Sequence, residues 1–362
     1  MSGPKPRAGV MDMPAYVGGR EKVEGVANPV KLSANENPLG ASPKAMAALS
    51  AYGDLAIYPD GHATALREKL AVLNNINAAQ IVCGCGSDEI LNLLTQGYLA
   101  PGDEAIHTEH GFLVYKLATG AAGGVPVCVA EKDLSADVDA ILAAVTEKTK
   151  LVFLANPNNP TGTMIDQAEV ERLHAGLPDN VILVLDGAYA EYVEPSRYPR
   201  DFAMVERFDN VVATRTFSKA YGLAALRVGW GYCPPAIADV LNRLRGPFNV
   251  NGPALAAAEA ALDDQAHIEE SRAHNAQWRD WLVQQLGGIG FDVRPSFANF
   301  ILVEFDDRKQ ALAAEGFMSR NGIIPRDLVA YGLPHALRLS IGTQAANRAA
   351  FDLLKQFRAR SD

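Results

Sequence analysis

Val181-Ile182-Leu183-Val184-Leu185-Asp186 is a run of apolar residues that ends on an aspartate. A strand that is apolar at every position has both faces buried, which is typical of a parallel sheet with helices on both sides. Other short β-type runs occur at Ile81–Cys85, Glu104–Thr108, Val125–Ala130, Leu151–Ala155, Val211–Thr214 and Val228–Tyr232. Amphipathic helical patterns lie between several of them, at Glu89–Leu99, Val138–Val145, Ala168–His174 and Ile237–Leu244. This alternation predicts an α/β fold whose large domain has a central, mostly parallel seven-stranded sheet flanked by helices.

The pattern changes after the Pro247–Pro253 segment. Two long helical patterns, three strand patterns and a final helix follow, at Ala254–Asp264, Ile268–Leu286, Asn299–Phe305, Gly322–Arg326, Leu337–Ile341 and Ala345–Arg358. This order predicts a smaller α+β domain at the C-terminus. We therefore divide the chain into an N-terminal arm at 1–45 that packs partly on the small domain, a large domain at 46–250 and a small domain at 251–362.

The composition excludes several classes of protein. The chain has 362 residues, with 33 Lys and Arg against 42 Asp and Glu, and its net charge of −9 counts against nucleic-acid binding. No uncharged stretch reaches the roughly 18 apolar residues of a membrane span, and no apolar run follows the basic N-terminus, so we expect no secretory signal. Four cysteines are too few for a disulfide scaffold, and Cys83-Gly84-Cys85 lacks the spacing of common zinc sites. We expect a reduced, cytoplasmic protein without a metal site.

Charged residues stand where two of the predicted strands end. Asp186 closes its strand, and the carboxyl ends of strands in an open α/β sheet line the ligand crevice, although a helix N-cap is the plainer interpretation. Lys219 follows another strand in Thr216-Phe217-Ser218-Lys219, where it could be a surface lysine or could approach an anion. Arg227 comes eight positions later in an apolar, glycine-flanked loop, which is an unusual place for an unpaired guanidinium.

Two more strands end in loops that suit a ligand. Ala155-Asn156-Pro157-Asn158-Asn159-Pro160-Thr161-Gly162 is either a plain turn or a binding loop held rigid by its prolines. Gly84-Cys85-Gly86-Ser87-Asp88-Glu89 precedes an apolar helix, where glycines and free amides suit a phosphate. This loop lacks the third glycine of a dinucleotide fingerprint, which argues against nicotinamide binding. This set of groups matches pyridoxal phosphate. The aspartate suits its ring nitrogen, the lysine its aldehyde, the asparagine its phenolic oxygen and the glycine-rich loop its phosphate.

Several motifs occur in a characteristic order and spacing: Lys31-Leu32-Ser33-Ala34-Asn35-Glu36-Asn37-Pro38-Leu39-Gly40, Tyr58-Pro59-Asp60, Gly86-Ser87-Asp88-Glu89, Asn158-Asn159-Pro160-Thr161-Gly162, Asp186-Gly187-Ala188-Tyr189, Ser218-Lys219 and Leu337-Arg338-Leu339-Ser340-Ile341-Gly342-Thr343. Through them the chain resembles the fold-type I pyridoxal-phosphate aminotransferases, and it is most similar to the histidinol-phosphate aminotransferase family. The resemblance covers nearly the whole sequence.

The resemblance implies roles for the residues around the cofactor. Lys219 would form the Schiff base with pyridoxal phosphate and move the substrate proton. Asp186 would keep the pyridine nitrogen protonated, and Asn159 and Tyr189 would bond the phenolic oxygen; Lys219, Asp186 and Tyr189 are the implied catalytic residues. Phe112 would stack on the ring, with a plain core phenylalanine as the alternative. The implied phosphate ligands are Gly86, Ser87, Asp88, Thr216, Ser218 and Arg227.

The resemblance also implies a homodimer in which Tyr58 reaches the cofactor phosphate of the second subunit. It implies a substrate pocket in which two arginines receive the anionic end of the substrate; this pocket is lined by Tyr16, Asn35, Arg326 and Arg338. A surface salt bridge is the alternative for either arginine, above all for Arg326 beside Asp327. The chain departs from the family on this substrate side, in the residues that flank Arg326 and in the arm sequence Tyr16-Val17-Gly18-Gly19-Arg20.

We expect a transaminase that moves nitrogen from L-histidinol phosphate to 2-oxoglutarate in histidine biosynthesis. An aromatic amino-acid (Phe/Tyr) aminotransferase is the first alternative, because the same arginines would bind a carboxylate, and a phospho-amino-acid decarboxylase is the second. A nicotinamide-dependent dehydrogenase would leave Lys219, Asp186 and Asn159 unexplained. A non-catalytic binding protein would be expected to lose the lysine. Neither nucleic acid nor a membrane is an expected partner.

Overall fold

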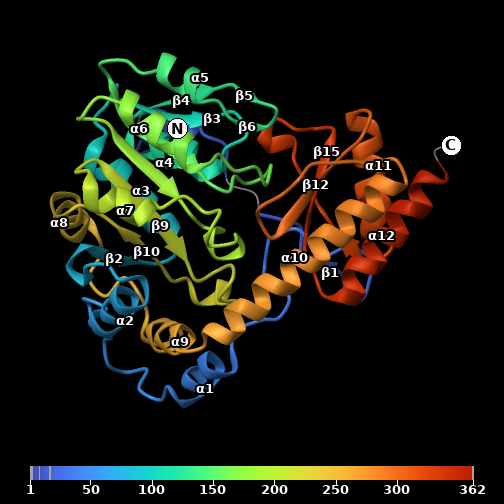
Figure 1. The fold of residues 1–362 in the computed structure, drawn as a ribbon, viewed down its shortest axis with the longest axis horizontal. Helices are drawn as coiled ribbons and strands as arrows, with labels where there is room; N and C mark the ends of the chain where they lie inside the picture. The colour runs from blue at the N-terminus through green and yellow to red at the C-terminus, as the bar shows by residue number, and fades with distance from the viewer. Residues whose placement is uncertain (1–2, 8, 16–17, 361–362) are drawn as a thin grey trace.

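The computed structural model describes residues 3–7, 9–15 and 18–360, and a seven-stranded sheet lies at the centre of its larger part (Figure 1). The strands are β2 (Ile81–Gly84), β3 (Glu104–Thr108), β4 (Val125–Val129), β7 (Thr149–Ala155), β8 (Ile182–Asp186), β9 (Val211–Thr216) and β10 (Gly229–Tyr232). They lie in the order β2-β10-β9-β8-β7-β3-β4, and only β10 runs antiparallel to its neighbours. The predicted mostly parallel seven-stranded sheet is confirmed.

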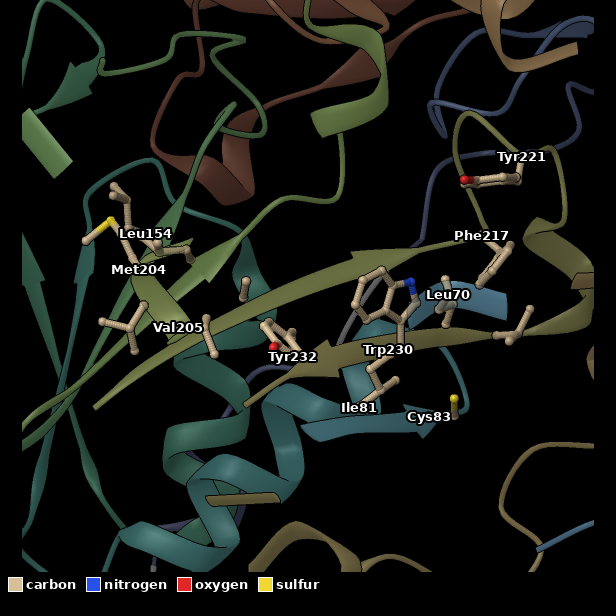
Figure 2. Close-up of a cluster of buried hydrophobic side chains, with 14 of the residues drawn as sticks. Leu70, Ile81, Cys83, Leu154, Met204, Val205, Phe217, Tyr221, Trp230 and Tyr232 are labelled. Carbon is tan, nitrogen blue, oxygen red and sulfur yellow. The ribbon is translucent and has the colours of Figure 1, made fainter. Parts of the chain in front are cut away.

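Burial on both faces of this sheet explains the apolar run of β8. Successive side chains of a strand point to opposite faces, so Leu183 and Leu185 enter one core while Ile182 and Val184 enter the other. The first core, part of which is shown in Figure 2, receives α1 (Pro43–Ala51), α2 (Thr64–Asn74), α5 (Val138–Ala143), α6 (Gln167–Gly176), α7 (Asp201–Arg207) and α9 (Gly252–Leu262). The second receives α3 (Ser87–Tyr98), α4 (Leu113–Ala122) and α8 (Pro235–Leu244).

The C-terminal part has its own antiparallel sheet and its own core. Its strands lie in the order β11-β12-β15-β14, with bounds Asp292–Val293, Phe300–Glu304, Ala336–Ser340 and Arg326–Asp327. The helices that pack on this sheet are α10 (Gln265–Gly288), α11 (Arg308–Arg320) and α12 (Gln344–Arg358). The predicted smaller α+β unit is therefore present.

The single strand predicted at Gly322–Arg326 is wrong. The structure has two short strands there, β13 (Ile323–Ile324) and β14, which are separated by Pro325. Proline has no N–H to donate to a ladder, so it ends one strand and allows the chain to pair elsewhere. β13 pairs with β1 (Val30–Lys31) of the N-terminal arm, whereas β14 pairs with β15.

α10 joins the two parts of the molecule (Figure 1). Its Ile268 belongs to the core of the large sheet, whereas Trp278 and Leu282 belong to the C-terminal core. α9 packs on α1 in the core of the large sheet. Packing thus favours a domain boundary within α10, and we propose that boundary in place of the division at residue 250. No helix of the described residues is long and apolar enough to span a membrane.

Candidate active site

The carboxyl ends of the parallel strands β7, β8 and β9 border a cavity of about 210 Å³. Its wall contains most of the residues that the sequence singled out: Asn35, Ser87, Asp88, Phe112, Asn159, Asp186, Tyr189, Thr216, Ser218, Lys219, Arg227, Arg326 and Arg338. These residues come from the N-terminal arm, the large sheet and the C-terminal sheet. The cavity therefore forms only where all three parts of the chain pack together.

One part of the cavity is suited to an anion. α3 begins at Ser87, and no side chain among the described residues caps its first turn, so the amides there can face a ligand. Gly86 has a φ of 81°, and a side chain at this position would collide with the guanidinium of Arg227. Arg227 donates to Ser218 Oγ at 3.0 Å and to Asp88 Oδ2 at 3.2 Å. A close glycine, helix amides and a guanidinium fit a phosphate group.

Asp186 is a buried carboxylate at the end of β8. Tyr115 Oη donates to its Oδ2 at 2.7 Å, while Thr214 Oγ1 and the amide of Ala188 donate to its Oδ1 at 3.0 and 3.2 Å. Burial raises the pKa of Asp186, and the bonds from Tyr115 and Thr214 oppose that rise. Among the described residues its charge is met by hydroxyl and amide donors and not by a basic side chain. This carboxylate can accept a cationic N–H from a ligand.

Lys219 supplies the amine of the site. Its Nζ donates to the carbonyl oxygen of Ala34 at 3.2 Å and lies 5.8 Å from the centre of the Tyr189 ring. Burial lowers the pKa of Lys219 to about 8, and the positive charge of Arg338 acts in the same direction. A substantial share of this amine is therefore neutral near pH 8, and a neutral amine is both a nucleophile and a proton acceptor. Just before Lys219 in the chain, Thr216 Oγ1 accepts a hydrogen bond from the amide N–H of Ser218 at 3.1 Å.

Asn35 connects the arm to both sheets at the cavity. Its Nδ2 donates to Tyr189 Oη at 2.9 Å, and its main-chain amide donates to Ser340 Oγ at 2.8 Å. Asn35 has a φ of 57°, a left-handed conformation that asparagine tolerates better than most residues. Asn159 lies in the same cavity wall, and its Oδ1 accepts a hydrogen bond from Arg338 Nη1. Its Nδ2 is the atom that can donate to a ligand oxygen.

The two arginines expected in the substrate pocket lie together. Arg326 on β14 is opposite Arg338 on β15, and both side chains are buried. Arg338 also donates to the carbonyl oxygen of Ser33 at 2.8 Å and lies 5.2 Å from the centre of the Phe300 ring. Asp327 is exposed, because adjacent residues of a strand face opposite sides. Because both arginines are buried, neither is a surface residue, which the alternative interpretation required.

Sequence reasoning missed Tyr115 and Tyr331, which also line the cavity. Tyr115 is buried on α4, and its ring meets that of Phe112 edge to face, with centroids 5.8 Å apart. The spacing of three residues between Phe112 and Tyr115 places them on one face of a helix, which is the signal that could have found Tyr115. Tyr331 follows β14 in a short helical turn, and no pattern in the sequence marks it.

Two of the predicted residues that the structure describes, Gly86 and Tyr58, are not in the cavity wall. Gly86 lies directly behind it, against Arg227. Tyr58 is on the surface, 78% exposed, and stacks on Phe248 with ring centroids 4.6 Å apart. Tyr16 lies outside the described residues. Within those residues, no group of three or more His, Cys, Asp and Glu side chains could hold a metal ion.

Comparisons with known proteins agree with this geometry. The pattern of a family described as "Aminotransferase class I and II" matches residues 27–354. The chain is 52% identical over 357 residues to a histidinol-phosphate aminotransferase of Dinoroseobacter shibae, with 98% of each chain covered. It is 51% identical over 364 residues to one of Rhodopseudomonas palustris, with 99% of this chain and 100% of the relative covered.

A solved structure is similar over the whole fold. It is the histidinol-phosphate aminotransferase of Sinorhizobium meliloti in complex with pyridoxal-5'-phosphate, which is 29% identical to this chain. The TM-score is 0.92, and 100% of each chain is covered. The arrangement of arm, large sheet and C-terminal sheet is thus shared with that enzyme.

Proposed function

The chain belongs to the class I and II aminotransferases, and from this we propose that it transfers the amino group of L-histidinol phosphate to 2-oxoglutarate. The products are imidazole-acetol phosphate and L-glutamate, which makes the reaction a step of histidine biosynthesis. The main support is one cavity that joins Lys219 and Asp186 to two separate guanidinium sites, one at Arg227 and one at Arg326 and Arg338. Two anion sites suit a phosphorylated cofactor and a phosphorylated substrate.

The residues present fit pyridoxal phosphate. Arg227, Ser218 and the first amides of α3 would hold its phosphate, and Asp186 would accept a hydrogen bond from its protonated ring nitrogen. The Asn159 amide and Tyr189 Oη lie on the same wall and would bond its phenolic oxygen. When bound, the cofactor supplies an aldehyde that links to amines and a ring that withdraws electrons.

Lys219 performs the proton transfer in this proposal. Its lowered pKa favours the neutral amine, so Nζ could accept the proton from the amine-bearing carbon of the donor and deliver it to the carbon that was the aldehyde carbon of the cofactor. The carbonyl oxygen of Ala34 and the ring of Tyr189 hold Nζ inside the cavity. Tyr115 and Thr214 donate to Asp186, and these bonds favour the ionised form of the carboxylate beside the ring nitrogen.

Arg326 and Arg338 bind the anionic end of each substrate. A phosphate monoester carries up to two negative charges and three oxygens, so it can engage both guanidinium groups, whereas a carboxylate has two oxygens and one charge. The arginine pair therefore favours a phosphorylated amino donor over phenylalanine or tyrosine. 2-Oxoglutarate would use the same pair through one of its carboxylates in the second half of the reaction.

We also propose that two copies of the chain form the working unit. Tyr58 stacks on Phe248, and Leu55 and Ile57 lie in the same exposed segment as Tyr58, so we treat the four residues as one apolar surface. The exposed fractions of Leu55, Ile57, Tyr58 and Phe248 in the single chain are 79%, 67%, 78% and 43%. A second copy would bury this surface and bring Tyr58 to the cofactor phosphate of its neighbour. The four free cysteines support a reducing compartment, and we propose the cytoplasm.

The choice of amino donor can be tested by steady-state kinetics with 2-oxoglutarate as acceptor. We expect kcat/KM for L-histidinol phosphate to exceed that for phenylalanine and tyrosine by at least about tenfold, which corresponds to about 1.4 kcal/mol of preference. A higher value for phenylalanine or tyrosine would instead identify an aromatic aminotransferase. Absence of cofactor uptake by the purified protein would contradict the whole proposal.

A further inference from the structure

Tyr115 connects two groups that the proposed cofactor would contact. It lies in the first turn of α4 and is 1% exposed. Its ring stacks on Phe153 of β7, with centroids 4.8 Å apart and planes at 2°, and it meets Phe112 edge to face. This packing fixes the ring, so the phenol oxygen has one position. That position is 2.7 Å from Asp186 Oδ2.

The bonds around Asp186 determine how strong a base this carboxylate is. Tyr115 occupies Oδ2, and Thr214 and the Ala188 amide occupy Oδ1. A hydrogen bond to an ionised carboxylate stabilises the ionised form and weakens its affinity for a proton. The titratable groups that interact most strongly with Asp186 are Tyr115, Asp88 and Tyr189, and none of these three carries a positive charge. Hydroxyl donors therefore replace a basic partner here.

We propose that Tyr115 is a positioning residue that makes Asp186 the weaker base toward the ring nitrogen of bound pyridoxal phosphate, so that the shared proton stays on the nitrogen. This inference rests on the proposed function, because it needs the cofactor ring beside Asp186. A protonated ring nitrogen attracts electrons more strongly than a neutral one. By keeping the proton on the nitrogen, Tyr115 would maintain the electron-withdrawing strength of the ring. Without the Tyr115 hydroxyl, the proton would move toward the carboxylate.

The test measures the proton on the ring nitrogen directly. Protein loaded with pyridoxal phosphate that carries the heavy nitrogen isotope in the ring is compared as wild type, Tyr115→Phe and Thr214→Val. The nitrogen NMR shift in wild type should be that of a protonated ring, and both variants should move it toward the unprotonated value. Tyr98→Phe is the matched control, since this half-buried tyrosine of α3 lies outside the cavity wall, and it should leave the shift unchanged.

A second readout is the pH at which the visible absorption of the bound cofactor changes. A positive ring nitrogen favours loss of the proton from the Lys219–cofactor linkage, so its partial loss should raise that midpoint in Tyr115→Phe by on the order of one pH unit. An unchanged nitrogen shift and midpoint in Tyr115→Phe would overturn the inference. If wild type takes up no cofactor, the proposed function fails instead, so the two failures are distinguishable.

Discussion

Arg326 and Arg338 are direct partners across the antiparallel strands β14 and β15, with both side chains buried beside the same cavity. Like charges directly opposite each other in a sheet destabilise it. Burial increases that cost, because water no longer screens the charges. An anionic ligand would offset the repulsion, and its binding site is then already arranged before it arrives.

Replacement of Arg338 by glutamine should weaken substrate binding. A charge-assisted hydrogen bond is worth about 1.5–3 kcal/mol, so kcat/KM for L-histidinol phosphate should fall by about ten- to a hundredfold, mainly through a higher KM. Arg326→Gln should change KM in the same direction. Arg320→Gln, at an exposed arginine of α11, is the control and should have no effect. An unchanged KM in both cavity variants would contradict an anion site at the arginine pair.

Cofactor capture by the cofactor-free protein should depend on pH through Lys219. The pKa of this lysine is lowered to about 8, so the neutral amine that attacks the aldehyde becomes the major form above that pH. The capture rate, followed by stopped-flow absorbance, should therefore rise as pH increases through about 8. Arg338→Gln removes a positive neighbour, so its midpoint should lie at higher pH. A wild-type midpoint near that of free lysine, about 10.4, would contradict the burial argument.

Lys219→Ala should separate cofactor binding from turnover. Arg227, Ser218 and Asp186 remain to hold pyridoxal phosphate, so the variant should still bind it. Proton transfer by a positioned side chain contributes about 10²- to 10⁴-fold, and loss of the linking amine adds to this, so transamination should fall by at least that factor. Lys355→Ala, at an exposed lysine of α12, should keep full activity. Measurable steady-state transamination at a wild-type rate by Lys219→Ala would refute the proton-transfer role.

The sequence predicted site residues best where a polar or charged residue directly follows an apolar strand. The run that ends at Asp186 predicts both a buried parallel strand and a polar group at its carboxyl edge, because position along a strand determines both. Lys219 and Arg227 are recognisable for the same reason: a charge beside an apolar segment needs a partner. The family resemblance then supplied roles for these residues that spacing alone could not.

Contacts between distant segments could not be predicted in this way. The bond from Tyr115 to Asp186 joins residues 71 positions apart, and it depends on how α4 packs across the sheet. The pairing of Arg326 with Arg338 depends on the strand break at Pro325. The pattern of apolar residues predicted one continuous strand there and gave no sign of this break. Local propensity contains no information about either tertiary contact.

The proposed dimer can be tested at its apolar surface. Leu55→Glu places a charge on a side chain that is 79% exposed in the single chain, so the folded monomer should tolerate it. Burying that charge against a second copy would be costly, so size-exclusion chromatography with light scattering should detect a monomer. Leu312→Glu is the matched control, at a 62% exposed leucine of α11, and should leave the assembly unchanged. Identical masses for the two variants would argue against this surface as the interface.

The buried ion pair between Arg215 and Asp201 should contribute strongly to the free energy of unfolding. Arg215 on β9 lies 2.7 Å from Asp201 Oδ2 through Nη1 and donates to Oδ1 at 3.0 Å through Nη2, and both side chains are buried. Burial raises the pKa of the neighbouring Glu191 to about 7, which makes it a poor substitute for the lost charge near neutral pH. Asp201→Asn should therefore lower the free energy of unfolding by about 3–5 kcal/mol, because it leaves Arg215 without its main partner.

Urea denaturation at a fixed protein concentration measures this loss, with the concentration held constant because assembly itself contributes stability. Asp239→Asn is the matched control, since Asp239 pairs with Arg243 at 2.9 Å where the two side chains are 61% and 75% exposed. An exposed pair of this kind contributes at most about 1 kcal/mol. If Asp201→Asn unfolds at the same urea concentration as Asp239→Asn, the buried pair does not stabilise the fold. The position of β9, the strand that leads to Lys219, must then depend on the apolar core alone.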